Sequence, residues 1–153
     1  VNQLLQRILD KWQPRFNHVQ VKNYFHRTDD LPPIRGDRRS LERVFINLFS
    51  NAVTAMEKIG GGALSVKTSL SEAIIDSPQI EITVSDNGPG IPDEIKKRIF
   101  EPFITTNEQG TGLGLSITKK IVTDHRGSIS VNTFPGGTIF HIYLPAYIGE
   151  NSK

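Results

Sequence analysis

Two glycine-rich loops constrain this chain more than any other feature of its sequence. The first is Asp86-Asn-Gly-Pro-Gly90. The second, about twenty residues later, is Gly110-Thr-Gly-Leu-Gly114, which leads directly into an amphipathic segment. Glycine adopts backbone conformations that other residues avoid and lets the main chain approach a ligand closely. The N-terminus of a helix presents unpaired N–H groups and the positive end of its dipole, which together suit a phosphate. A loop with a carboxylate and a second loop suited to anions predict a nucleotide site.

The spacing of the second loop, G-x-G-x-G, excludes two common phosphate motifs. A P-loop ends in Gly-Lys-Ser/Thr, whereas Leu115-Ser116 follow the last glycine here. A dinucleotide fingerprint has a different glycine spacing and an acidic residue about twenty positions further on, which this chain lacks. The three glycines also form a hinge, so we expect residues 104–112 to close over a ligand.

Hydrophobic periodicity surrounds these loops with helices and strands. Apolar stripes predict helices over residues 1–13, ended by Pro14; over about 37–58, with Asp37 as N-cap; around 93–100; and over about 113–125, with Gly127 as C-cap. Even spacing of apolar residues predicts strands over residues 19–25, 64–66, 80–84, 128–134 and 138–144. This order predicts an α+β fold, a two-layer sandwich with helices packed on one face of a mixed five-stranded sheet.

Composition narrows the class of protein further. The 153 residues suffice for one domain with its own core, and no apolar run approaches the length of a transmembrane helix. The net charge of +2 gives no argument for nucleic acid as a partner. The lack of cysteine excludes disulfides and thiolate metal sites and agrees with our expectation of a cytoplasmic domain. The chain begins with Val rather than Met, so we expect a fragment of a longer protein.

Two asparagines lie on the predicted helix over residues 37–58. Asn47 and Asn51 are four residues apart and share one face at the border of the apolar stripe, and Thr54 and Lys58 continue the line. A carboxamide oxygen suits a hard cation such as Mg²⁺, with a triphosphate supplying the other ligands. The alternative is a polar fringe that makes only local hydrogen bonds, and the residues alone leave both readings open.

Asp86 ends a predicted strand and opens the first glycine loop. Its carboxylate is suited to accept a hydrogen bond from the exocyclic amine of adenine, with Gly88 and Gly90 letting the backbone pass close to the base. Asp-Asn-Gly is also a common turn sequence, and that alternative stays open.

Five segments, in this order, resemble the motif boxes of the catalytic, ATP-binding domain of bacterial sensor histidine kinases, which belong to the GHKL superfamily. They are the N box at residues 41–53, the first glycine box at 84–92, the F box at 99–106, the second glycine box at 110–117 and the closing strand at 136–145. The N and F boxes are most similar to those of the nitrogen-regulation-type subgroup.

The resemblance implies the Bergerat ATP-binding fold and a protein histidine kinase that uses ATP and Mg²⁺. It implies that Asn51 is the Mg²⁺ ligand, Asn47 a phosphate-side contact and Asp86 the adenine acceptor, with Thr138 nearby. The resemblance also implies that Ala55, Gly88, Gly90 and Ile91 lie around the base or sugar. Further ATP-binding positions are expected in or beside a mobile lid that packs against Phe100 and Phe103: Phe103, Thr105, Thr106, Gly110, Thr111, Gly112, Leu113, Gly114 and Leu115.

One position departs from the subgroup, which has Lys where Asn107 stands. We therefore expect the cation for the γ-phosphate to come from elsewhere, with Lys58 as the first candidate and Arg98 as the second.

A second comparison separates kinase from ATPase. The ATPases of the superfamily resemble one another in a Glu four residues before the Mg²⁺-binding Asn, which serves as general base for water. Asn47 stands at that position and its amide cannot take a proton. Glu42 lies about 180° around the helix from Asn51, at about 100° per residue. The sequence therefore favours a kinase.

The phosphoacceptor is expected outside this chain, because none of its four histidines is followed by the Glu or Asp usual in the family. We expect residues 1–15 to be the tail of a second dimerisation helix, 16–148 the catalytic domain and 149–153 a C-terminal tail. The resemblance implies transfer of the ATP γ-phosphoryl group to a histidine of the dimerisation domain and relay to a response regulator receiver domain. It also implies that the full-length protein is a homodimer and that this fragment is a monomer. The resemblance leaves open whether the full-length protein is anchored in a membrane. The alternative is a nucleotide-binding regulatory module of the same fold without phosphotransfer, which Asn107 favours.

Overall fold

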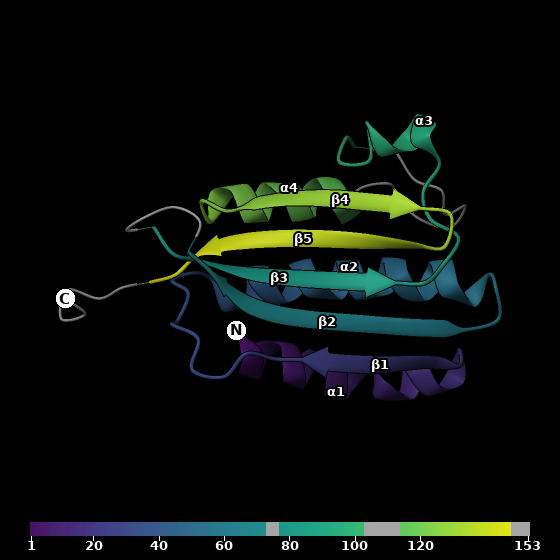
Figure 1. Ribbon diagram of the computed structural model, residues 1–153, viewed down its shortest axis with the longest axis horizontal. Helices are drawn as coiled ribbons and strands as arrows, with labels where there is room; N and C mark the ends of the chain where they lie inside the picture. Colours follow the sequence, from purple (N-terminus) through teal and green to yellow (C-terminus); the bar gives the residue numbers. More distant parts are fainter. Residues whose placement is uncertain (73–76, 103–113, 148–153) are drawn as a thin grey trace.

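The computed structural model describes residues 1–72, 77–102 and 114–147, and its elements follow the predicted order (Figure 1). The helices of this part are α1 (Asn2–His18), α2 (Arg38–Glu57), α3 (Asp93–Lys96) and α4 (Gly114–Asp124). The strands are β1 (Val21–His26), β2 (Gly62–Ser71), β3 (Gln79–Asp86), β4 (Ser128–Phe134) and β5 (Gly137–Pro145).

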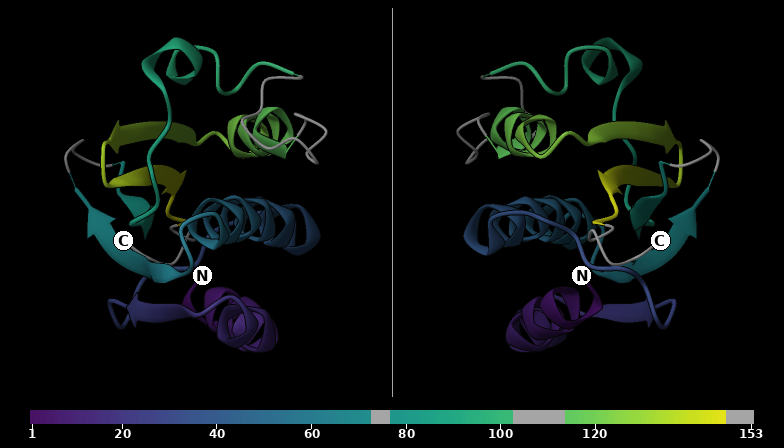
Figure 2. Two further views of the ribbon diagram at one scale, coloured as in Figure 1. Left: turned by 90° about the vertical axis from the view of Figure 1, so that its right-hand side faces the viewer. Right: turned by 90° about the vertical axis from the view of Figure 1, so that its left-hand side faces the viewer.

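The five strands form one mixed sheet in the order β1-β2-β3-β5-β4. β1 pairs parallel with β2, and the other three pairs are antiparallel. Helices α1, α2 and α4 lie side by side on one face, with α2 in the middle (Figure 2). The predicted two-layer α+β fold with helices on one face of a mixed sheet is confirmed.

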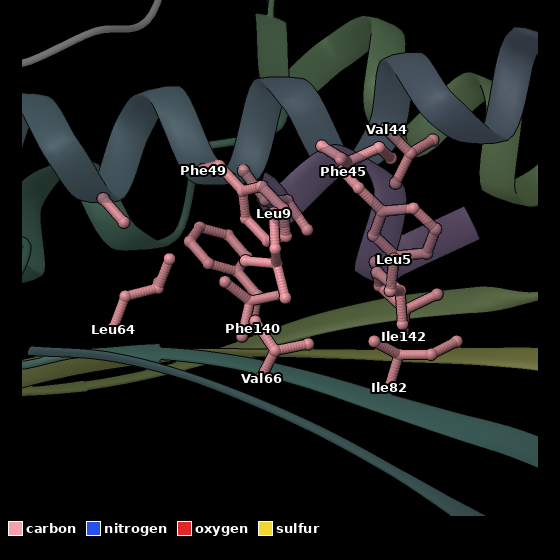
Figure 3. Close-up of a cluster of buried hydrophobic side chains, with 14 of the residues drawn as sticks. Leu5, Leu9, Val44, Phe45, Phe49, Leu64, Val66, Ile82, Phe140 and Ile142 are labelled. Carbon is pink, nitrogen blue, oxygen red and sulfur yellow. The ribbon is translucent and has the colours of Figure 1, made fainter. Parts of the chain in front are cut away.

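The core lies between α2 and the sheet. Phe45 and Phe49 of α2 are fully buried and point toward the sheet, and Phe45 lies above Ile142 and Ile82, which alternate with polar residues along their strands (Figure 3). Asp37 begins α2 as predicted, since its side chain accepts a hydrogen bond from the backbone N–H of Ser40 at 3.2 Å. Burial of one helix face therefore fixes α2 across the middle of the sheet.

The predicted end of the first helix at Pro14 was wrong. α1 continues to His18 because Phe16, beyond the proline, is fully buried and packs near Trp12 with ring centroids 6.0 Å apart. Proline removes one helical hydrogen bond, and burial of a large aromatic side chain offsets that loss. The boundary expected between residues 15 and 16 falls inside this helix, and Leu5 is buried in the same core as the sheet, so α1 is part of this domain's core.

The end of α4 is where the sequence predicted, but Gly127 has a different role. The left-handed residue there is Arg126, with φ 63°. A Cβ atom on Gly127 would collide with the carbonyl oxygen of Tyr143, so glycine is needed for close approach of the chain to β5.

Within residues 1–72, 77–102 and 114–147, no helix combines the length and apolarity that a bilayer crossing requires.

Candidate functional site

Four parts of the fold lie at the same end of the molecule: the C-terminal ends of α2 and β3, the turn between β4 and β5, and the N-terminal end of α4 (Figure 1). The first glycine loop, which follows β3, and Gly114, which begins α4, therefore lie at the same end of the molecule. α2 lies between them and carries the predicted asparagines.

Asn47 connects α2 to the start of α4. Its Nδ2 donates hydrogen bonds to the carbonyl oxygen of Gly114 and to Oγ1 of Thr118, each at 3.2 Å. Thr118 is fully buried, and its hydroxyl donates to the same carbonyl at 2.8 Å. The carboxamide thus fixes the first turn of α4, which is more than the polar fringe that the sequence left open.

Asn51 lies one turn further along α2 and is exposed. Within the described ranges, its carboxamide makes no hydrogen bond to the protein. Its oxygen is therefore available to a ligand, as a metal-binding role requires.

Ala55 continues the same line of α2 and reaches the first glycine loop. A Cβ atom on Gly88 would lie 3.2 Å from the Cβ of Ala55 and 3.0 Å from Oδ1 of Asp86. Glycine at position 88 therefore lets the loop pack directly on α2. The line Asn47–Asn51–Ala55 therefore runs from Gly114 to the first glycine loop.

Asp86 is a partly buried carboxylate at the end of β3. Its Oδ1 accepts a hydrogen bond from the backbone N–H of Gly88 at 2.9 Å, while Oδ2 has no protein donor among the described residues. Burial raises the pKa of Asp86 to about 6, and the hydrogen bond from Gly88 opposes this only in part. A ligand that donates a hydrogen bond to Oδ2 would relieve this desolvation.

The turn between β4 and β5 closes the other side of the first glycine loop. Gly90 has φ 84°, and a Cβ atom there would collide with the carbonyl oxygen of Phe134. The backbone N–H of Ile91 donates to Oγ1 of Thr133 at 2.7 Å. Thr138, expected near adenine, is 4% exposed and pairs with Asp86 across the sheet.

Sequence reasoning missed three residues here: Asn87, Thr118 and Thr133. The Oδ1 of Asn87 accepts a hydrogen bond from the backbone N–H of Ala63 at 2.8 Å and so joins the loop to β2. Thr118 follows Gly114 by one helical turn, a spacing that was visible in the sequence. Nothing in the sequence pairs Thr133 with Ile91.

The two candidate cations differ in their surroundings. The Nε of Arg98 forms an ion pair with Oε2 of Glu101 at 2.7 Å. Lys58 is the C-cap residue of α2 and is exposed, two turns beyond Asn51. Both stay predictions for the γ-phosphate contact.

Part of the predicted lid lies outside the described residues: Phe103, Thr105, Thr106, Gly110, Thr111, Gly112 and Leu113, as does Asn107. Leu115 is partly buried against the core. Phe100 packs edge-on against Phe140, with centroids 6.4 Å apart, and carries the Lys119 ammonium 5.4 Å above its ring.

Glu42, which the sequence places on the opposite side of the helix from Asn51, also faces away from Asn47. Glu42 pairs with Lys11 of α1 at 3.7 Å, whereas Asn47 contacts α4, and these helices flank α2 on opposite sides (Figure 2). In the described part of the chain, no three His, Cys, Asp or Glu residues are grouped to hold a metal ion. Among the described residues, the side chain of Asn47 contacts Gly114 and Thr118, and no hydrogen bond joins it to a carboxylate.

Comparison with known proteins agrees with this geometry. The sequence profile described as "Histidine kinase-, DNA gyrase B-, and HSP90-like ATPase" matches residues 36–148. The chain is 42% identical over 123 residues to the sensory histidine kinase/phosphatase NtrB of Rhodobacter capsulatus, and the alignment covers 75% of this chain and 34% of that protein. It is 36% identical over 146 residues to sporulation kinase E of Bacillus subtilis, and the alignment covers 95% of this chain and 19% of that protein. The chain thus spans about a third or less of these relatives.

Solved structures give the same result. The catalytic domain of histidine kinase ThkA aligns with a TM-score of 0.81 at 30% identity, covering 95% of this chain and 92% of that one. ThkA in complex with the response regulator protein TrrA aligns with a TM-score of 0.77 at 28% identity, covering 96% of this chain and 40% of that one.

Proposed function

This chain belongs to the family of histidine kinase-, DNA gyrase B- and HSP90-like ATPases, and from that membership we propose that it is the ATP-binding catalytic domain of a sensor histidine kinase. The observation that carries the proposal is Asn47. A carboxamide stands beside Gly114 at the start of α4, at the position where an ATPase of the superfamily is expected to have a carboxylate base.

ATP binds with its adenine at Asp86. The carboxylate Oδ2 accepts a hydrogen bond from the exocyclic amine, and Thr138 lies beside it on β5. Gly88 and Gly90 keep the loop close to α2 and to the β4–β5 turn, so the main chain itself can lie against the base.

The residues present fit a magnesium ion bound jointly with the triphosphate. Asn51 offers one hard oxygen on an exposed surface, and Mg²⁺ in nucleotide sites commonly takes one or two protein ligands together with phosphate oxygens and water. Bound there, the ion would neutralise charge on the phosphates. Asn47 holds the first turn of α4 in place, so that its backbone N–H groups face the phosphates.

The reaction is transfer of the γ-phosphoryl group to a histidine. An imidazole nitrogen forms the new N–P bond, the bond between the γ-phosphorus and the bridging oxygen breaks, and ADP leaves; the imidazole N–H proton passes to solvent. A neutral imidazole is nucleophilic without a base, so the domain contributes positioning and charge neutralisation. Lys58 is the first candidate for the cation at the γ-phosphate, and Arg98 the second.

The acceptor histidine belongs to a dimerisation domain of the same protein, which makes the full-length protein a homodimer. The phosphoryl group then passes to a response regulator receiver domain; the complex of ThkA with TrrA supports this choice of partner. We place the domain in the cytoplasm, where ATP is available.

The test mixes the chain with a separate histidine-bearing dimerisation domain and γ-labelled ATP. We expect an acid-labile, base-stable label on the dimerisation domain, weak because separation of the domains lowers their effective concentration. Asn51→Ala should abolish labelling, and Glu42→Gln should leave it unchanged. Rapid ATP hydrolysis by the chain alone, lost in Glu42→Gln, would instead identify an ATPase. Tight ATP binding without labelling of any of several dimerisation domains would identify the regulatory module.

A further inference from the structure

The end of β4 holds the second half of the first glycine loop at two adjacent points. The hydroxyl oxygen of Thr133 accepts a hydrogen bond from the backbone N–H of Ile91 at 2.7 Å, and the carbonyl oxygen of Phe134 lies directly against Gly90. Ile91 and Thr133 are 42 residues apart in the sequence, so this contact exists only in the folded sheet.

The Thr133 hydroxyl has further contacts on the adenine side of the sheet. Its Oγ1 lies 3.3 Å from the carbonyl oxygen of Gly137, to which it donates, and 3.4 Å from Oγ1 of Thr138. A hydroxyl has one proton and two lone pairs. The Thr133 hydroxyl therefore accepts from the N–H of Ile91 and donates to the carbonyl of Gly137, and in its contact with the Thr138 hydroxyl either oxygen can be the donor.

The 3.4 Å contact with Thr133 holds the Thr138 hydroxyl at a fixed position next to β4. Thr138 is the residue that pairs with Asp86 across the sheet. One side chain therefore anchors the loop and positions the hydroxyl beside the carboxylate.

We infer that Thr133 is a positioning residue for the adenine base: its hydroxyl fixes the Gly90–Ile91 segment and the Thr138 hydroxyl in the geometry that the base requires. The inference rests on the proposed ATP-binding function and adds to it a residue that does not itself touch the nucleotide. Loss of the hydroxyl would free the loop, and binding would then have to order it again.

The test compares Thr133→Val, which removes the hydroxyl at nearly constant shape, with Thr133→Ser, which keeps it. Thr83→Val is the matched control, because Thr83 lies on the uncovered face of β3 and its hydroxyl makes no hydrogen bond in the described part of the chain. By calorimetry, Thr133→Val should weaken ADP binding about tenfold, the loss expected for one hydrogen bond and an ordered loop. Thr133→Ser and Thr83→Val should stay within about twofold of the wild type.

Amide hydrogen exchange separates positioning from general stability. In Thr133→Val the amide of Ile91 should exchange at least about tenfold faster, while the amide of Ile82 in the core of β3 stays protected. If that variant does not fold, Thr133→Ala, which adds no methyl group, replaces it. ADP binding within twofold of the wild type, with Ile91 still protected, would overturn the inference. A wild-type chain that fails to bind ADP would overturn the proposed function itself.

Discussion

Asp86→Asn should make the nucleotide-free domain more stable and a poorer nucleotide binder. The carboxylate is partly buried, accepts one hydrogen bond from Gly88 and has no cationic partner among the described residues, which raises its pKa to about 6 from an ordinary value of 3.8. Each pKa unit corresponds to ~1.4 kcal/mol, so the ionised side chain destabilises the fold by about 3 kcal/mol above pH 6. The amide of Asn costs about 1 kcal/mol to desolvate, which leaves a net gain of about 2 kcal/mol at pH 7.5.

The sign of the pH dependence is specific. The folded pKa is above the unfolded one, so the folded state binds more protons, and the destabilisation by Asp86 grows as pH rises from about 4 to 6. Below that window both states are protonated and the cost disappears. The stability advantage of Asp86→Asn should therefore be about 2 kcal/mol smaller at pH 4 than at pH 7.5.

Urea unfolding at both pH values measures this difference, provided the slope m is unchanged. Glu94→Gln removes a carboxylate at an exposed position of α3 and serves as the control, with no comparable gain. In the same samples Asp86→Asn should bind ADP at least about tenfold more weakly, since stabilising changes at binding sites commonly cost function. A destabilised variant, or a stability difference that does not change with pH, would refute the reasoning about burial.

Three further predictions test other parts of the domain. Asn51→Ala should abolish the gain in ADP affinity that Mg²⁺ provides while leaving metal-free binding unchanged, as calorimetry with and without the metal will measure; an undiminished Mg²⁺ effect would contradict the metal assignment. Asp37→Ala should lower the free energy of unfolding by about 1 kcal/mol in urea titration, because α2 loses its N-cap hydrogen bond; a loss below a few tenths of a kcal/mol would count against the cap. Phe45→Ala should cost about 3–5 kcal/mol in the same assay, and a cost near that of a surface change would argue against the position of α2 on the sheet.

The sequence by itself determined the local elements and the chemistry of the site. The apolar stripe of α2, the N-cap at Asp37 and the alternation of β3 and β5 follow from periods of 3.6 and 2 residues that each segment carries on its own. The motif boxes supplied the family, and the spacing of Asn47 and Asn51 placed both on one line of α2. These features depend on neighbours a few residues away, which a single sequence displays directly.

Tertiary structure decided the remaining contacts. α1 continues beyond Pro14 because Phe16 is buried in the core. Glycine is needed at position 127 because a Cβ atom there would collide with the carbonyl oxygen of Tyr143. Asn47 meets Gly114 across 67 positions of sequence. Such contacts depend on the order and register of strands and on the packing of helices, which bring together residues whose separation along the chain carries no periodic signal. The free energy of burial is shared across the whole core, so no local segment alone specifies which distant residue it will contact.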